Sequence, residues 1–87
     1  MKRNEVYKVI DGERDYQDKK WGGKEHDEEH SIEDWLEFME DAFYKANNAR
    51  SDDESLDELR QVVALGIACM EVHGVPERFN VLPENYV

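Results

Sequence analysis

The sequence has a single cysteine, Cys69, and only two prolines and five glycines among its 87 residues. One cysteine excludes an internal disulfide framework and a cluster of thiolate metal ligands. No apolar run approaches the roughly 20 residues of a membrane-spanning helix, and the first residues do not lead into the apolar stretch of a signal peptide. We therefore expect a cytoplasmic protein that makes no contact with a membrane.

Basic residues are also scarce. Twenty-two acidic residues against eleven basic ones give a net charge of -11, which disfavours direct binding to nucleic acid or to an anionic membrane. The excess lies almost wholly in residues 26–87, which hold sixteen acids and four bases. Such a surface suits divalent cations, basic protein surfaces or mimicry of nucleic acid, although solubility alone also explains it.

Few chain breaks and apolar spacings of three and four residues predict an all-α fold, with one domain over residues 1–87. Three main helices are expected, over about 4–20, over about 32–49 and from a cap at Asp53 or Ser55 to His73. Residues 22–30 are predicted to form a loop, and residues 75–87 a short tail that packs on the bundle. From Val62 to Val72 the third helix is apolar nearly all round, so we expect it at the centre of a compact bundle completed by oligomerisation.

Two polar residues project along the apolar stripe of the first helix, which consists of Val6, Val9, Ile10 and Tyr16. These are Glu13 and Gln17. An inward carboxylate needs a cation, a hydrogen-bonded partner or the mouth of a cavity, because burying it unpaired costs several kcal/mol. The alternative is that the stripe ends at Ile10 and the rest of the helix is solvated.

The third helix is acidic at its start and apolar beyond. Glu54, Asp57, Glu58 and Gln61 share one side, a layout expected where carboxylates of facing helices converge on a metal or phosphate at the rim of a helical core. The second helix contributes Glu40 at the border of its apolar stripe. The alternative is that acids in a first helical turn favour the helix dipole, which accounts for Glu54 and largely for Asp57. Glu71, late in the third helix, should pair with Arg14, Arg60 or a neighbouring subunit.

Residues 26–30 match the His-x-x-Glu-His pattern of one class of zinc peptidase. A peptidase is not expected, because these residues fall in a predicted loop of a very small chain with no distant third ligand. A weak zinc or nickel site on His26 and His30 remains open. His73 is expected to interact with the last carbonyls of the third helix. Cys69 has no basic neighbour that would activate it, so covalent catalysis is not expected.

Three segments carry a resemblance to known proteins: residues 13–22, Trp35-Leu36 with Glu40, and residues 56–74. Together they look like small proteins of bacteriophages and prophages. More distantly, they resemble the all-α nucleoside triphosphate pyrophosphohydrolases of the MazG-like and dimeric dUTPase group, in which E-x-x-E and E-x-x-D motifs hold Mg²⁺. Glu37-x-x-Glu40 with Glu54-x-x-Asp57 matches the spacing, whereas Glu40 with Glu58 and Gln61 fits the inward faces but has Gln61 in place of a carboxylate.

The resemblance implies a phage-type nucleotide-binding protein in the host cytosol that forms a homodimer or higher oligomer. In its catalytic form it would be a Mg²⁺-dependent pyrophosphohydrolase. Its catalytic residues would be Glu40 and Glu58, and Glu40, Asp57 and Glu58 would hold the metal. The nucleotide would contact Glu13, Gln17, Lys20, Trp21, Arg60 and Gln61. The alternative is a non-catalytic acidic inhibitor that binds a basic host protein of defence or nucleic-acid metabolism, or sequesters a nucleotide signal. A purely structural oligomer is the third possibility.

Overall fold

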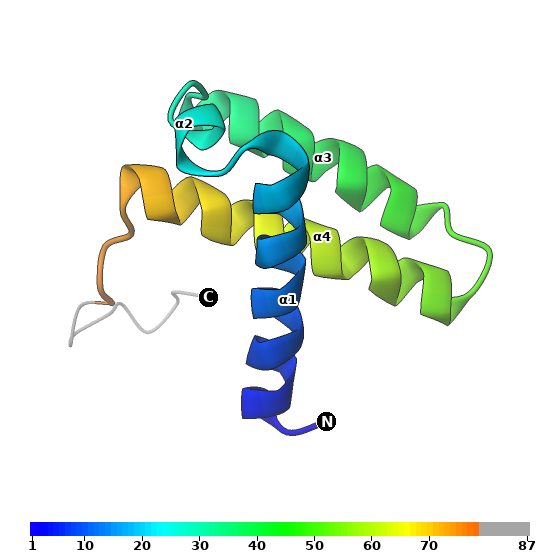
Figure 1. Cartoon of the computed structure of the whole chain (residues 1–87). Coiled ribbons are helices and arrows are strands. Elements are labelled where there is room, and N and C mark those ends of the chain that lie inside the picture. Colours follow the sequence, from blue (N-terminus) through cyan, green and yellow to red (C-terminus); the bar gives the residue numbers. More distant parts are fainter. Residues whose placement is uncertain (79–87) are drawn as a thin grey trace.

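The computed structural model describes residues 1–78 as four helices, with no strand in this part of the chain (Figure 1). They are α1 (Arg3–Trp21), α2 (Lys24–Asp27), α3 (Ile32–Asn47) and α4 (Asp52–His73). The all-α prediction and its three main helices are confirmed. Most of the predicted tail, residues 79–87, lies outside the described residues.

The helices α3 and α4 form an antiparallel hairpin that holds most of the core (Figure 1). Its buried centre consists of Trp35, Ala42, Leu65 and Ala68, with Phe38, Met39, Val62 and Cys69 packed against it. α4 also contacts α1 and α2. The apolar circumference of α4 therefore has the central position that the sequence predicts.

Local capping explains where the helices begin and end. Gly22 (φ 101°) ends α1 as its N–H donates to the Asp18 carbonyl, and Gly74 (φ 84°) ends α4 as predicted. Ser31 and Asp34 form the predicted capping box of α3. The predicted cap of α4 is wrong: Ser51, rather than Asp53 or Ser55, accepts a hydrogen bond from the Glu54 N–H. Ser51 directly precedes the first helical residue, so its hydroxyl can reach the N–H of the third helical residue, Glu54.

The prediction that residues 22–30 form a loop is wrong in part, because residues 24–27 form the single helical turn α2. Gly22 and Gly23 both have positive φ, which reverses the chain directly after α1. The reversal brings Asp27 into a buried position. The hydrogen bond from Arg14 on α1 to Asp27 therefore stabilises a turn that its local sequence does not predict.

In Figure 1, α1 crosses the α3–α4 hairpin steeply, and its first half extends beyond it. The buried side of α1 is Ile10, Arg14 and Gln17, at the spacing of successive helical turns. Of the predicted apolar stripe, only Ile10 is buried; Val6, Val9 and Tyr16 are exposed. The contact between α1 and the hairpin is therefore largely polar. We call the buried Arg14 and Gln17, with the residues that they bond, the polar seam.

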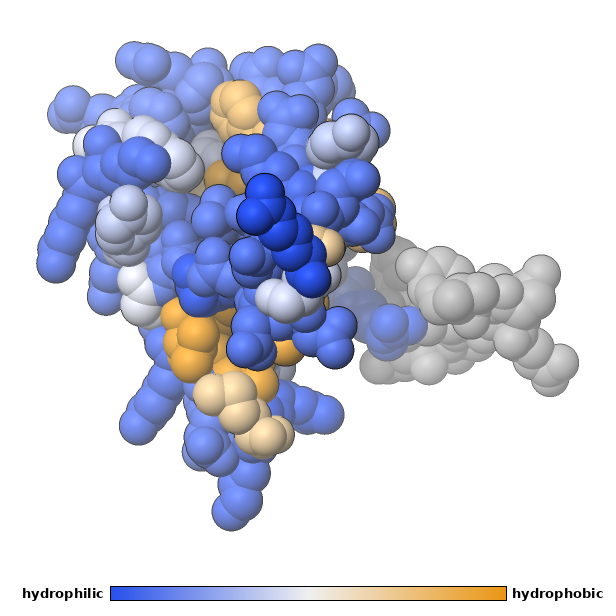
Figure 2. Space-filling view, turned by 90° about the vertical axis from the view of Figure 1, so that its right-hand side faces the viewer, coloured by the Kyte–Doolittle hydropathy of each residue, from blue (hydrophilic) through white to orange (hydrophobic). Residues whose placement is uncertain are grey.

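The exposed apolar residues of α1 lie beside the start of α4. Together they line a groove of about 420 Å³, and its apolar walls include Val6, Val9, Leu56, Leu59 and Val63. Figure 2 shows a mostly hydrophilic face with a hydrophobic patch in its lower half. None of the helices in the described part of the chain has the length and hydropathy that a membrane crossing requires.

Candidate functional site

The polar seam centres on Arg14, which joins three helices. Its guanidinium donates to both oxygens of Glu71 on α4 (3.2 and 3.1 Å), to Gln17 (2.9 Å), to Asp18 (3.0 Å) and to Asp27 on α2 (3.3 Å). Burial alone would lower the pKa of Arg14, but the hydrogen bond and charge of Glu71, together with Asp18 and Asp27, raise it above its ordinary value. The predicted pairing of Glu71 with Arg14 is confirmed. Gln17, predicted to contact a nucleotide, is occupied inside this seam.

A second ionic group starts from the residue directly before Arg14 on α1, Glu13. The Arg60 Nε donates to Glu13 Oε1 (2.7 Å), and its Nη2 donates to Asp57 Oδ1 (2.7 Å). The hydrogen bond to Glu13 is the largest influence that raises the pKa of Arg60. Glu13 therefore faces inward as predicted, and Arg60 is the cation that it requires. Three residues that were predicted to bind a nucleotide or a metal, Glu13, Asp57 and Arg60, therefore lie together, and the arginine bonds both carboxylates.

An aromatic hollow of about 390 Å³ lies between α2, α3 and α4. Trp21 and Gln61, two of the predicted nucleotide-binding residues, both line it. We use the name aromatic hollow for the following set: Trp21, His26, His30, Trp35, Phe38, Asp41, Ala42, Lys45, Gln61 and Leu65. Its volume lies within the range typical of small-molecule sites, which are mostly apolar with a few convergent polar groups.

The rings of the aromatic hollow are held in defined positions. The His30 ring meets Trp35 and Phe38 edge-on, at centroid distances of 5.7 and 5.1 Å. The His26 ring lies roughly parallel to Trp21 at 6.0 Å. Lys20, another predicted binding residue, places its Nζ 5.4 Å from the Trp21 ring centroid. A planar ligand would thus enter a preformed set of rings with a cation at its edge.

Trp35 has a hydrogen-bond donor that no described residue satisfies. The side chain is 1% exposed, and its Nε1 has no partner within residues 1–78. A buried N–H without an acceptor costs about 1–3 kcal/mol. Trp35 is among the residues that line the aromatic hollow, but the Nε1 atom itself is shielded from solvent, so a bound acceptor would reach it only after a local shift of the surrounding side chains.

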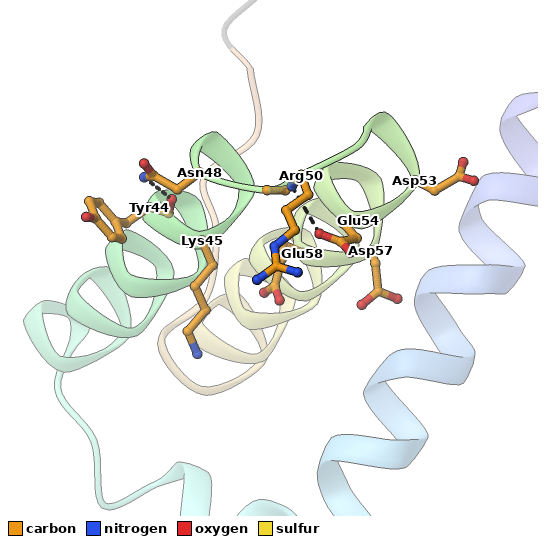
Figure 3. A pocket seen from close by; sticks show the side chains of 9 residues that line it. Tyr44, Lys45, Asn48, Arg50, Asp53, Glu54, Asp57 and Glu58 are labelled. Carbon is orange, nitrogen blue, oxygen red and sulfur yellow. Dashed lines mark hydrogen bonds between the residues drawn. The ribbon is translucent and has the colours of Figure 1, made fainter.

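An acidic hollow of about 590 Å³ lies at the end of the α3–α4 hairpin (Figure 3). Lys45 comes from α3, Arg50 from the connecting loop, and Glu54, Asp57 and Glu58 from α4. The complete lining is Tyr44, Lys45, Asn48, Ala49, Arg50, Asp53, Glu54, Asp57 and Glu58. Two predicted metal ligands, Asp57 and Glu58, therefore share one cavity with two cations. Lys45 lines both this hollow and the aromatic hollow.

The third predicted metal ligand, Glu40, is exposed on α3 and lines neither hollow. Within residues 1–78, no three or more His, Cys, Asp or Glu side chains form a group that could hold a metal ion. Magnesium binding by Glu40, Asp57 and Glu58 stays a prediction. The His73 prediction is wrong in its partner: Nε2 lies 3.0 Å from the His30 carbonyl, because that segment packs beside the end of α4.

Sequence reasoning missed Asp27, Asp41 and Lys45 as parts of sites, and gave Arg14 only as a possible partner of Glu71. The spacing from Ile10 to Arg14 to Gln17 would have placed Arg14 on the buried side of α1. Asp27 carries no comparable pattern, because its burial depends on the chain reversal at Gly22 and Gly23.

Comparison with protein-family models, curated proteins and solved structures found no match to this chain. The resemblance to phage proteins and to the MazG-like group therefore stays a prediction.

Proposed function

We propose that this protein binds a nucleotide, with the base in the aromatic hollow. The observation that carries the proposal is the buried, unpartnered Trp35 Nε1–H in the wall of a cavity that is otherwise rich in rings. Bases offer both a flat π-surface and ring acceptors, so one ligand can stack on the rings and accept the indole hydrogen. Gln61 and Asp41 supply further polar contacts that can distinguish one base from another.

The phosphates would extend from the aromatic hollow past Lys45 into the acidic hollow. Lys45 lines both cavities, and Arg50 lies beyond it in the acidic hollow. A phosphate chain needs such cations, whereas Glu54 and Glu58 would repel it unless a divalent cation lies between them. The acids therefore favour a nucleotide that arrives with Mg²⁺, which Glu58 would contact.

Calorimetric titration with a panel of linear and cyclic nucleotides, with and without Mg²⁺, tests this proposal. We expect Trp35→Phe, which keeps a ring but removes the N–H, to weaken binding about tenfold, as expected for one hydrogen bond of about 1.4 kcal/mol. Glu58→Gln should weaken only the binding that depends on Mg²⁺. Glu37→Gln is the matched control, because Glu37 is exposed and lines neither hollow.

If the wild type bound none of the nucleotides, the proposal would be contradicted. Equal affinity of wild type and Trp35→Phe would move the site away from the aromatic hollow. Release of pyrophosphate in the presence of Mg²⁺ would extend the proposal from binding to hydrolysis, and its absence would restrict the function to binding.

The exposed acids of α3 favour a second candidate, an inhibitor that mimics nucleic acid. Glu33, Glu37 and Glu40 are all exposed and spaced along one side of this helix. A mimic should bind purified basic nucleic-acid-binding proteins of the host, with affinity that falls steeply with salt because the screening length shrinks to about 3 Å at 1 M. Binding that is absent or insensitive to salt would exclude this candidate.

We also propose that the chain self-associates through the groove between α1 and α4. Exposed apolar residues line it, Val6 and Leu56 among them. Lys2 and Arg3 lie at the start of α1, whereas Asp52 and Asp53 lie at the start of α4, so the chain offers charges of both signs to a second copy. Light scattering should give a dimer or larger species for the wild type and a monomer for Leu56→Lys; a monomeric wild type would contradict this.

A further inference from the structure

Two histidines at the mouth of the aromatic hollow face each other through the same ring nitrogen. The Nε2 atoms of His26 and His30 lie 3.4 Å apart, and the ring centroids lie 4.9 Å apart in an edge-on arrangement. His26 belongs to α2, and His30 directly precedes the Ser31 cap of α3. The chain reversal and the cap thus hold both rings.

The opposite nitrogen of each ring faces a carboxylate. His26 Nδ1 lies 3.0 Å from Asp27 Oδ1, and His30 Nδ1 lies 3.4 Å from Asp34 Oδ2. Since an ionised carboxylate only accepts hydrogen bonds, His26 carries hydrogen on Nδ1 when it bonds Asp27, and its Nε2 is then an acceptor. His30 Nε2 can donate a hydrogen bond to that nitrogen, or, with hydrogen on its own Nδ1 toward Asp34, it offers a second lone pair to a shared cation.

Both carboxylates are themselves held in place. Asp27 is 5% exposed and receives a hydrogen bond from Arg14 through its other oxygen. Asp34 Oδ2 accepts a hydrogen bond from the Ser31 backbone N–H. Carboxylates that orient the far nitrogen of a histidine are typical outer-shell partners in metal sites.

We propose that His26 and His30 together bind one transition-metal ion of the Zn²⁺, Ni²⁺ or Cu²⁺ class through their Nε2 atoms. Two nitrogens bound to one tetrahedral ion at about 2.0–2.1 Å lie roughly 3.3–3.4 Å apart, which is the separation found here. Neutral imidazole suits this class of ions, whereas Mg²⁺ and Ca²⁺ prefer oxygen. The inference does not depend on nucleotide binding.

The ion would keep open coordination positions. Within residues 1–78, no third His, Cys, Asp or Glu completes a group with this pair, so water or a ligand in the aromatic hollow would occupy the rest. Such a site is a binding centre for an exchangeable ion, unlike the closed four-ligand sites that stabilise small folds. In the absence of metal, His30 Nε2 and His26 Nε2 can form a hydrogen bond with each other.

Titration of the full chain with ZnCl₂, followed by calorimetry and by ¹⁵N NMR of the histidine side chains, tests this inference. We expect one ion per chain, a shift of the Nε2 resonances of His26 and His30 only, and affinity at least about tenfold lower in His26→Gln and in His30→Phe. His30→Phe keeps a ring against Trp35 and Phe38, which preserves packing. Glu37→Gln is the control and should bind zinc like the wild type, because Glu37 is exposed and lines neither hollow.

Three results would overturn the inference. The first is no binding at millimolar zinc, which would leave the pair as a hydrogen bond between the two rings. The second is binding that persists unchanged in His26→Gln, which would mean adventitious contact elsewhere on the acidic surface. The third is a shift of Nδ1 rather than Nε2 resonances, which would place the ion on the wrong side of the rings.

Discussion

The guanidinium of Arg14 holds the carboxylate of Glu71 by two hydrogen bonds across 57 residues of sequence, from the middle of α1 to the end of α4. The same guanidinium reaches Asp27. One side chain therefore links α1, α2 and α4. Arg14 and Asp27 are both buried, whereas the Glu71 side chain is 54% exposed, so removing Arg14 would leave Asp27 with the desolvation cost of an unpaired buried charge.

Replacement of Arg14 by methionine should destabilise the fold by about 3 kcal/mol or more. Methionine fills part of the volume but leaves the Asp27 carboxylate buried without a cation. Urea unfolding followed by circular dichroism measures the loss. Arg3→Met is the matched control, since Arg3 is exposed on the same helix, and it should change stability by no more than about 0.5 kcal/mol. Equal effects of the two variants would show that the seam does not stabilise the protein.

The Glu13–Arg60 pair should show measurable coupling. The Glu13 side chain is 10% exposed and accepts a 2.7 Å hydrogen bond from Arg60 Nε, so a double-mutant cycle with Glu13→Gln and Arg60→Gln should give about 1 kcal/mol. Asp57 bonds the same arginine but is 52% exposed. The parallel cycle with Asp57→Asn should therefore give a smaller value. A larger coupling for Asp57 would contradict this ranking.

Alanine substitutions at two glycines of α1, one within the helix and one at its end, should change the stability of the protein in opposite directions. Gly12 lies within the helix, and a Cβ there would meet no atom within 4 Å, so Gly12→Ala should stabilise the protein by about 1 kcal/mol. Gly22 has a φ of 101°, so Gly22→Ala should destabilise it by about 1 kcal/mol or more. Thermal unfolding of both variants checks the signs. Stabilisation by Gly22→Ala would mean that the reversal after α1 is not required.

The capping carboxylate of α3 should make stability depend on acid. The backbone hydrogen bond from Ser31, aided by His30, lowers the pKa of Asp34 below its ordinary value of 3.8, although desolvation opposes this. Its stabilising contribution is thus fully present above the ordinary value and is lost as the pH falls through the lowered one. Carboxyl ¹³C titration of Asp34 should give a midpoint below 3.8. Asp34→Asn should flatten the acid limb of the stability profile, and a midpoint above 3.8 would refute the cap.

The sequence predicted the helices well because their ends depend on local chemistry. Ser31 with Asp34 and the glycines 22 and 74 act within one turn of the backbone, so their effects can be inferred without the fold. Ser51 was missed as the cap of α4 because several adjacent residues in that turn have suitable side chains. Propensity alone does not choose among them.

The candidate sites could be predicted only in part. Spacing placed Glu13 and Gln17 inward, and it placed Asp57 and Glu58 together, as found. The aromatic hollow could not be predicted from the sequence. Its rings, from Trp21 to Phe38, lie on both sides of the chain reversal at Gly22 and Gly23, and they come together only in the folded chain. For the same reason, the pattern that links His26 to His30 gave a candidate metal site but not the geometry of its nitrogens.

The α3–α4 hairpin and α1 are held in the fold by different kinds of interaction, because α1 packs through the polar seam. The α3–α4 hairpin is held by apolar burial, while α1 contributes one buried apolar side chain and two buried polar ones. Added sulfate strengthens the first kind of contact, and it screens the second at its exposed members, Asp18 and Glu71. Amide hydrogen exchange in α1 should therefore accelerate with added sulfate while that in α3 and α4 slows, so the first helix is the part of the fold that can open on its own.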